Sequence, residues 1–336
     1  MTIGTRAVSL SGTTAPENDS VDLRSGDARA PAESGRRPSD ASDERLDTTM
    51  SSALTYENTR ATATIDGVEF LYHEAGSGPP LLLLHGSGPG VTAWSNFGEN
   101  LPFFAEHFRV VMPDLPGFGG TQLPELKEVY TLSGARWIAR LLDELGIGST
   151  VVIGNSMGGA IAAEMAAHLP ERVERMAIMG SGGLSLSLFQ TEPSEGFQRL
   201  FAFLQDPTRE RMVEWVTTMV HDQALVTDEL VDRRFANATA DGVLDRTRAV
   251  FGAMFNPALR EDYTPLWTHL ETITTPTLML WGREDRMLPY DQAHLANRWV
   301  PNIELHTFSR CGHWIQIEKK REFERVTHEF LTRDLS

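Results

Sequence analysis

The stretch GNSMGG at residues 154–159 decides the fold of this 336-residue chain. An apolar run at 151–153 precedes it, and a run of small residues at 160–167 follows it. This order predicts a strand, a sharp turn with Ser156 at its apex, and a helix, since glycines on both sides of the serine leave room for a tight turn. The pattern is typical of a nucleophile elbow, in which the first N–H groups of the helix point at the group that the serine attacks.

A serine nucleophile needs a general base, and the base needs a carboxylate that orients it. After an elbow of this kind the acidic residue comes next along the chain and the histidine comes last. The strand-like run 277–281 leads into Gly-Arg-Glu-Asp, which places Asp285 on a loop at the end of a strand, with Glu284 as its only close rival. The run 303–308 leads into Ser-Arg-Cys-Gly-His, which predicts His313 as the base.

Two neighbours of His313 carry chemically versatile side chains. His306 lies inside the preceding strand pattern, so we expect it to have a structural role. Cys311 is the single cysteine of the chain, which rules out an internal disulfide and is typical of a protein from a reducing compartment. Because Ser156 is the better-placed nucleophile, we expect the thiol of Cys311 to pack rather than to react.

An oxyanion formed by attack on a carbonyl needs N–H donors around it. We expect the first donor from Met157, directly after the nucleophile, and the second from the loop after an earlier strand. The apolar run 81–84 leads into His-Gly-Ser-Gly-Pro-Gly at 85–90, in which Ser87 is the predicted donor. His85 is expected to hold this loop in place rather than to take part in the chemistry.

The composition limits the partners and the compartment of the protein. Its formal net charge is −16, which argues against nucleic acid and anionic membranes as partners but leaves room for a small anion beside one local arginine. Hydrophobic residues make up 41%, as in proteins with a packed core, and no apolar run approaches the ~18 residues that a membrane span requires. We therefore expect a cytoplasmic protein.

The order of apolar runs predicts an α/β protein with a mostly parallel sheet that is flanked by helices. Residues 1–55 contain no aromatic side chain and no apolar periodicity, so we expect a disordered N-terminal extension. Residues 56–181 and 271–336 alternate between strands and helices and form the expected core. Residues 182–270 break this alternation with amphipathic helical patterns, which predicts an inserted helical lid over the carboxyl edge of the sheet.

The individual elements of the core follow from their periodicity. After a hairpin that ends near 69–72, the expected strands are 81–84, 109–112, 150–153, 175–179, 277–281 and 303–308. The expected helices outside the lid are 94–105, 132–145, 157–168, 291–299 and 318–332.

Several segments together resemble the α/β-hydrolase superfamily from about residue 57 onward, and within it the meta-cleavage product hydrolases. Enzymes of that family split a carbon–carbon bond in 2-hydroxy-6-oxo-hexa-2,4-dienoates, which are ring-opened aromatic compounds. The segments that carry the resemblance are HGSGPGVTAWSNF at 85–97, GNSMGG at 154–159, GSGGLSLSLF at 180–189, DELVDRRF at 228–235, WGREDRMLP at 281–289 and CGHWIQIEK at 311–319. The lid resembles the branch that acts on bulky substituents, but Ser87 stands where that branch usually has glycine and matches the alkylbenzene type.

The resemblance implies a role for each residue that matches a motif of the family. The catalytic triad of the family matches Ser156, Asp285 and His313. Its oxyanion donors match Ser87 and Met157. The groups that hold the dienoate end of the substrate match Asn96, Asn155, Arg234 and Trp314, with Arg233 as the alternative to Arg234.

The resemblance also implies the reaction and what it requires. The dienoate takes a proton at carbon 5, so that the later carbon leaving group is a stabilised dienolate, and no metal or organic cofactor is needed. The implied partner is a small-molecule dienoate from aromatic or steroid catabolism, and we expect a homo-oligomer. One alternative is a general serine esterase, against which Asn96 and Arg234 speak because a neutral ester has no anionic end. The other is a ligand-binding protein on the same fold, which the complete triad disfavours.

Overall fold

The structure, a computed structural model, describes residues 54–184 and 192–334. The described residues form one compact unit, which contains every helix and strand found among them. The expected N-terminal extension, residues 1–55, lies almost entirely outside the described residues, as does the stretch 185–191 of the expected lid.

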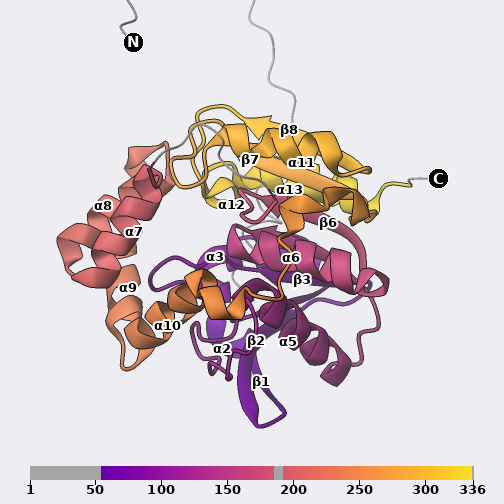
Figure 1. Cartoon of the computed structure of the whole chain (residues 1–336), viewed down its shortest axis with the longest axis horizontal. Coiled ribbons are helices and arrows are strands. Elements are labelled where there is room, and N and C mark those ends of the chain that lie inside the picture. Colours follow the sequence, from indigo (N-terminus) through magenta and orange to yellow (C-terminus); the bar gives the residue numbers. More distant parts are fainter. Residues whose placement is uncertain (1–53, 185–191, 335–336) are drawn as a thin grey trace, which may run out of the picture. The chain divides into compact units, whose positions relative to one another are not determined.

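An eight-stranded sheet lies at the centre of the unit (Figure 1). Its strand order is β1-β2-β4-β3-β5-β6-β7-β8. Its strands are β1 (Arg60–Ile65), β2 (Val68–Ala75), β3 (Pro80–Leu84), β4 (Arg109–Pro113), β5 (Thr150–Asn155), β6 (Val173–Met179), β7 (Thr277–Gly282) and β8 (Ile303–Phe308). β1 and β2 form an antiparallel hairpin, β2 pairs antiparallel with β4, and the other pairs are parallel. The predicted mostly parallel sheet is therefore confirmed, and the predicted hairpin forms its antiparallel edge.

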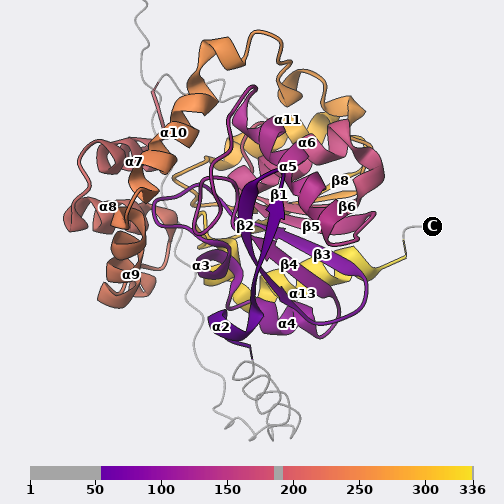
Figure 2. The ribbon, with the colours of Figure 1, turned by 90° about the horizontal axis from the view of Figure 1, so that it is seen from below.

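Helices cover both faces of the sheet, which explains why its central strands are continuous apolar runs. In β3, Leu82 and Leu84 belong to one hydrophobic core, whereas Leu81 and Leu83 belong to another. The first core is completed by α5 (Tyr130–Glu144), α6 (Met157–His168) and α11 (Ala293–Trp299). The second is completed by α3 (Ala93–Phe97), α4 (Leu101–Ala105), α12 (Ile315–Glu318) and α13 (Lys320–Thr332). Figure 2 shows α5 and α6 on one side of the sheet and α4 and α13 on the other.

Two predicted helices are each divided in the structure, whereas α6 matches its predicted bounds. The expected helix 94–105 breaks into α3 and α4, because Pro102 has no N–H to continue a helix and stands instead in the first turn of α4. The expected helix 318–332 is interrupted near its start by Lys319, whose backbone leaves the helical region at φ −125° and ψ 37° between the end of α12 and the beginning of α13. The remaining short helices are α2 (Tyr56–Thr59), η1 (Pro170–Arg172), η2 (Gln223–Leu225), η3 (Pro257–Leu259), η4 (Leu266–Thr268), η5 (Leu270–Thr272) and η6 (Tyr290–Gln292).

Between β6 and β7 the described chain forms a group of helices that we call the insertion. It consists of α7 (Glu195–Gln205), α8 (Arg209–Met219), α9 (Asp228–Thr239) and α10 (Val243–Phe255). A hydroxyl group caps each of the first three, since Ser194, Thr208 and Thr227 accept N–H groups of the first turn. The insertion stands at one side of the sheet (Figures 1 and 2), and its α10 contacts α5 of the adjacent helical layer. Among the described residues no helix is both long and apolar enough to span a membrane.

The turn between β5 and α6 depends on very close backbone packing at Gly158. A Cβ atom at this position would lie 2.1 Å from the carbonyl oxygen of Leu84 in β3 and 2.6 Å from that of His85. Backbone atoms of a central strand do not move aside cheaply, so only glycine lets α6 begin this close to the sheet.

Gly158→Ala is expected to lower the melting temperature by about 5–10 °C, because overpacking costs ~1–3 kcal/mol or more and a domain of this size loses ~2–4 °C per kcal/mol. Differential scanning calorimetry measures the change. Gly148→Ala is the matched control, since a Cβ atom at Gly148 meets nothing within 4 Å. Equal melting temperatures of the two variants would contradict the packing argument.

Candidate active site

Ser156 stands where β5 ends and α6 begins. Its backbone has φ 54° and ψ −113°, a conformation that residues with a side chain rarely adopt. Strain of this kind costs ~1–3 kcal/mol and persists only where the surroundings hold it. Here the N–H of Ser156 donates to the carbonyl of Met179 at 2.8 Å, and β5 is paired with strands on both sides. Ser156 is therefore fixed at the carboxyl end of a central strand, directly before the start of α6.

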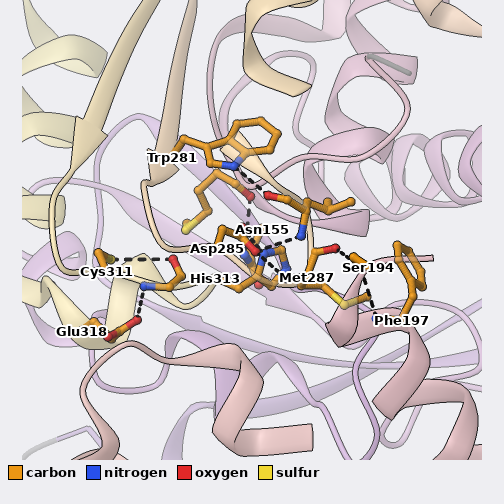
Figure 3. A network of polar contacts seen from close by, with 12 residues as sticks. Asn155, Ser194, Phe197, Trp281, Asp285, Met287, Cys311, His313 and Glu318 are labelled. Carbon is orange, nitrogen blue, oxygen red and sulfur yellow. Dashed lines mark hydrogen bonds and ion pairs between the residues drawn. The ribbon is translucent and has the colours of Figure 1, made fainter. Parts of the chain in front are cut away.

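His313 and Asp285 form a buried hydrogen-bonded pair (Figure 3). Nδ1 of His313 lies 2.7 Å from Oδ2 of Asp285, and the two side chains are 4% and 0% exposed. The other carboxylate oxygen, Oδ1, accepts the N–H groups of Met287 and Leu288, each at 2.8 Å. Because a carboxylate oxygen accepts hydrogen bonds, Nδ1 of His313 is the donor of this pair, and Nε2 is the ring nitrogen that can accept a hydrogen bond.

The residues next to this pair have other contacts. Glu284, the rival of Asp285, accepts the N–H of Cys311 at 2.9 Å through Oε2. His306 is an exposed residue of β8. Cys311 is buried, and burial raises the pKa of its thiol well above the ordinary value, which makes the thiol a poor nucleophile at neutral pH.

A small cavity of about 20 Å³ brings most of the predicted site residues together. Its wall includes the predicted residues Ser87, Asn96, Asn155, Ser156, Arg234, His313 and Trp314. Asp285 does not line the cavity and reaches it through His313. Met157 does not line it either; it is the first residue of α6, and the leading N–H groups of a helix have no acceptor within the helix.

Two buried asparagines form a polar part of the cavity wall. Nδ2 of Asn96 donates to Oδ1 of Asn155 at 3.3 Å, and Nδ2 of Asn155 donates to the carbonyl of Met179 at 3.5 Å. Oδ1 of Asn96 has no hydrogen-bond partner among the described residues. This oxygen is therefore available to accept a hydrogen bond from a bound molecule.

The guanidinium of Arg234 in α9 is buried in the cavity wall and has no counter-ion among the described residues that line it. The residue is 1% exposed, and none of its three guanidinium nitrogens has a hydrogen-bond partner in the described part of the chain. Its Cζ lies 4.8 Å from the ring centroid of Trp314, a cation–π contact that offsets part of the cost of burial. Burial, with a smaller effect of Arg233, lowers the pKa of Arg234 to about 10, so the side chain keeps its charge at neutral pH.

Arg233, the alternative to Arg234, points elsewhere on the same helix. It is exposed, and its Nη1 lies 3.3 Å from Oε1 of Glu229, one turn earlier in α9. Arg234 lines the cavity and Arg233 does not. The helix thus directs one of two adjacent arginines to the cavity and the other to solvent.

Part of the cavity wall is apolar, and the sequence alone does not distinguish these side chains from those of the hydrophobic core. These residues are Val91, Leu200, Trp215, Met219 and Met287. Leu200, Trp215 and Met219 lie on the apolar faces of α7 and α8, and such a face has the same spacing whether it covers a core or a ligand. Trp215 packs edge-to-face on Trp314, with ring centroids 5.7 Å apart.

His85 holds the glycine-rich loop through both of its ring nitrogens. The N–H of Leu115 donates to Nε2 at 2.9 Å, so the ring proton is on Nδ1, which donates to the carbonyl of Gly86 at 2.6 Å. Burial lowers the pKa of His85 to about 4, which keeps the ring neutral at neutral pH. These contacts fix the loop that carries Ser87.

Comparison with known proteins identifies the family. The sequence profile of the alpha/beta hydrolase fold matches residues 79–320. The chain belongs to the α/β-hydrolase fold family. A 2-hydroxy-6-oxo-6-phenylhexa-2,4-dienoate hydrolase from Burkholderia cepacia is 38% identical to this hydrolase over 260 residues, which are 77% of this chain and 90% of the relative.

Other relatives indicate the family within this fold, and their names refer to different substrates. A 2-hydroxy-6-oxononadienedioate/2-hydroxy-6-oxononatrienedioate hydrolase from Burkholderia vietnamiensis is 39% identical over 274 residues, which are 80% of this chain and 93% of the relative. The solved structure of a meta-cleavage product hydrolase from Pseudomonas fluorescens IP01 has a TM-score of 0.72 and 32% identity, and the match covers 81% of this chain and 97% of the solved one. Within the superfamily, this hydrolase is therefore a member of the meta-cleavage product hydrolases.

The depressed pKa of His85 predicts that the hydrolase loses stability in mild acid. The unfolded chain takes up a proton near the ordinary value of 6.5, whereas folded His85 resists protonation down to about 4. Its contribution to stability is thus complete above pH 6.5 and is lost as the pH falls from there toward 4. At pH 5 the loss for this one group is about 2 kcal/mol, which denaturant unfolding at pH 7 and pH 5 measures.

His85→Gln tests the assignment, because an amide does not titrate. The variant is expected to be less stable than the wild type at pH 7 but to lose about 2 kcal/mol less between pH 7 and pH 5. His73, with a pKa lowered to about 4, and Asp114, with a pKa raised to about 6, titrate in both proteins and cancel in the comparison. A fall in the variant as large as that in the wild type would assign the acid sensitivity to another group.

Proposed function

We propose that this hydrolase cleaves the carbon–carbon bond of a ring-opened aromatic meta-cleavage product of the 2-hydroxy-6-oxo-hexa-2,4-dienoate type. In this proposal Ser156 is the nucleophile, His313 the base and Asp285 the residue that orients the base. One observation carries it: the buried guanidinium of Arg234, without a hydrogen-bond partner among the described residues, lines the same cavity as the serine and the histidine. Hydrolysis of a neutral substrate gives such a charge no task.

An unpaired cation inside a protein is costly, so Arg234 calls for an anionic partner from outside the chain. A guanidinium is suited to paired oxygens, which it binds with two parallel hydrogen bonds. A dienoate presents such a pair at one end, namely the carboxylate and the oxygen at carbon 2. The unpartnered Oδ1 of Asn96 is a suitable acceptor for the hydroxyl group of the same end.

In the proposed mechanism the reaction begins with a proton shift in the bound dienoate. The hydroxyl proton at carbon 2 passes to carbon 5 with His313 as the shuttle, and the dienol becomes a ketone. Arg234 stabilises the negative charge that develops on the oxygens at carbons 1 and 2 during this shift. The step is needed because a carbon leaving group departs readily only when its electron pair can spread into a carbonyl system.

Cleavage then follows the course of acyl transfer. Ser156 attacks the carbonyl at carbon 6 while Nε2 of His313 takes the serine proton, and the N–H groups of Ser87 and Met157 hold the oxyanion. The bond between carbons 5 and 6 breaks, its electron pair enters the dienolate, and His313 returns the proton to this fragment. Water, activated by His313, hydrolyses the ester on Ser156 and releases a carboxylic acid.

Arg234→Ala is expected to lower kcat/KM for the dienoate by about 30- to 5,000-fold, since loss of one partner of a buried charge pair costs ~2–5 kcal/mol. Hydrolysis of p-nitrophenyl acetate should change little, because this ester has no anionic end. Loss of the visible colour of the dienoate and release of p-nitrophenolate measure the two rates. Ser156→Ala is the blank for both, with an expected loss of order 10⁶ in kcat.

Arg233→Ala is the matched control, since Arg233 is exposed and paired with Glu229 on the same helix. It should leave both rates unchanged. Equal losses on both substrates in Arg234→Ala would mean that Arg234 serves the fold. A wild type that hydrolyses the ester but cleaves no dienoate would put a general serine esterase in place of the proposed function.

The cavity wall also bears on the group that the substrate carries at carbon 6. Among the described residues that line the cavity, Arg234 is the single arginine or lysine. The stretch 185–191, Ser-Leu-Ser-Leu-Phe-Gln-Thr, contains no lysine, arginine or histidine either. Leu200, Met219 and Met287 offer no partner to a second carboxylate. We therefore propose that the substituent at carbon 6 is uncharged, either alkyl or aryl.

This proposal predicts discrimination between two substrates that relatives are named for. The kcat/KM for 2-hydroxy-6-oxo-6-phenylhexa-2,4-dienoate should exceed that for 2-hydroxy-6-oxononadienedioate by about 100-fold or more, because a buried carboxylate without a partner costs several kcal/mol. Stopped-flow absorbance with both compounds at the same ionic strength measures the ratio. A ratio near one, or in favour of the dicarboxylate, would contradict an uncharged substituent.

A further inference from the structure

One carboxylate joins the loop of His313 to the insertion. Oε1 of Glu318 in α12 accepts the N–H of Gly312 at 2.6 Å, while Oε2 accepts those of His221 and Asp222 at 2.8 and 3.0 Å. His221 and Asp222 follow shortly after α8, so a single side chain holds two segments that are far apart in the sequence. Figure 3 shows Glu318 directly beside the loop of His313.

Backbone contacts bring the same two segments together. The carbonyl of Met219, the last residue of α8, accepts the N–H of His313 at 2.8 Å and that of Trp314 at 3.3 Å. A Cβ atom at Gly312 would lie 2.7 Å from the Met219 oxygen, so the loop approaches the end of α8 as closely as glycine allows. The backbone of the proposed base is thus hydrogen-bonded to the insertion.

The helix that is held in this way also shapes the cavity. α8 contributes Trp215 and Met219 to the wall, beside His313 and Trp314 of the loop. A shift of α8 relative to the loop therefore changes the cavity wall and the position of His313 together.

We propose that Glu318 is a positioning residue that keeps His313 and the end of α8 in register for catalysis. A carboxylate suits this place because its two oxygens accept all three N–H groups at once, whereas the amide of glutamine has a single acceptor oxygen. Without it, the partly buried N–H of Gly312 and the exposed N–H groups of His221 and Asp222 lose their shared acceptor, and only the bonds to the carbonyl of Met219 still join the two segments. The inference rests on the proposed role of His313 as the base.

Glu318→Gln tests this role with almost no change in shape, since one carboxylate oxygen becomes a donor that faces other donors. The kcat for p-nitrophenyl acetate and that for the dienoate should each fall by about 10- to 100-fold, as for a catalytic group displaced by ~1 Å, with little change in KM for the ester. Glu322→Gln is the matched control, because Glu322 is an exposed residue in the first turn of α13. It should retain the rates of the wild type.

Amide hydrogen exchange provides a readout that does not depend on turnover. In Glu318→Gln, exchange should become faster in both segments that the carboxylate joins, 219–225 and 309–314, and in Glu322→Gln it should be unchanged. Faster exchange in only one of the two segments, or in neither, would overturn the bridging role.

The ester assay separates this test from the test of carbon–carbon cleavage. If the wild type cleaves no dienoate, the proposed function fails, but the ester rates and the exchange rates still decide the role of Glu318. A wild-type kcat for the ester in Glu318→Gln would overturn the proposal. A variant that no longer folds would do so as well, because a positioning residue leaves the fold intact.

Discussion

The strained turn at Ser156 is the constraint on which the site depends. A positive φ at a residue with a side chain is stable only if the neighbouring backbone is fixed, and β5 is fixed between β3 and β6. Because parallel strands end at the same edge of a sheet, the loops after β3, β7 and β8 bring Ser87, Asp285 and His313 to the edge where Ser156 stands. The sheet therefore positions the proposed nucleophile and its neighbours before a substrate arrives.

Chain order alone predicts Ser156, Asp285 and His313 at the carboxyl edge of the sheet, because each follows an apolar run, whereas Asn96 and Arg234 are predicted only through the family resemblance. The sequence does not place Trp215 and Met219 in the site, since the apolar face of a helix has the same spacing whether it covers a core or a cavity. Glu318 gives no signal because its partners are backbone N–H groups, which nearly every residue possesses. The interruption at Lys319 is not predicted either, because the apolar spacing continues past this residue although its backbone leaves the helical conformation.

The stability of the fold alone does not explain why the charged side chain of Arg234 is buried. Its contact with Trp314 contributes ~0.5–2 kcal/mol, whereas an unpaired buried charge costs several kcal/mol. The pKa of about 10 reflects this imbalance and yet leaves the side chain charged at neutral pH. A buried charge of this kind is tolerated where it serves binding, because the cation has already lost its hydration when an anion binds to it.

The proposed nucleophile, Ser156, and the buried cation, Arg234, come from different parts of the chain. Two chemical tasks are therefore assigned to two different segments. In the proposed mechanism the sheet loops supply acyl transfer, which esters and dienoates share, whereas α9 supplies the charge that only a dienoate uses. Carbon–carbon cleavage requires both at a fixed spacing, because the proton shift at one end of the substrate must precede attack at the other. The contacts of Met219 and Glu318 with the loop of His313 provide such spacing between the insertion and the sheet. Changes in α8 and α9 can therefore alter which substrate is accepted while Ser156 and Asp285 stay in place.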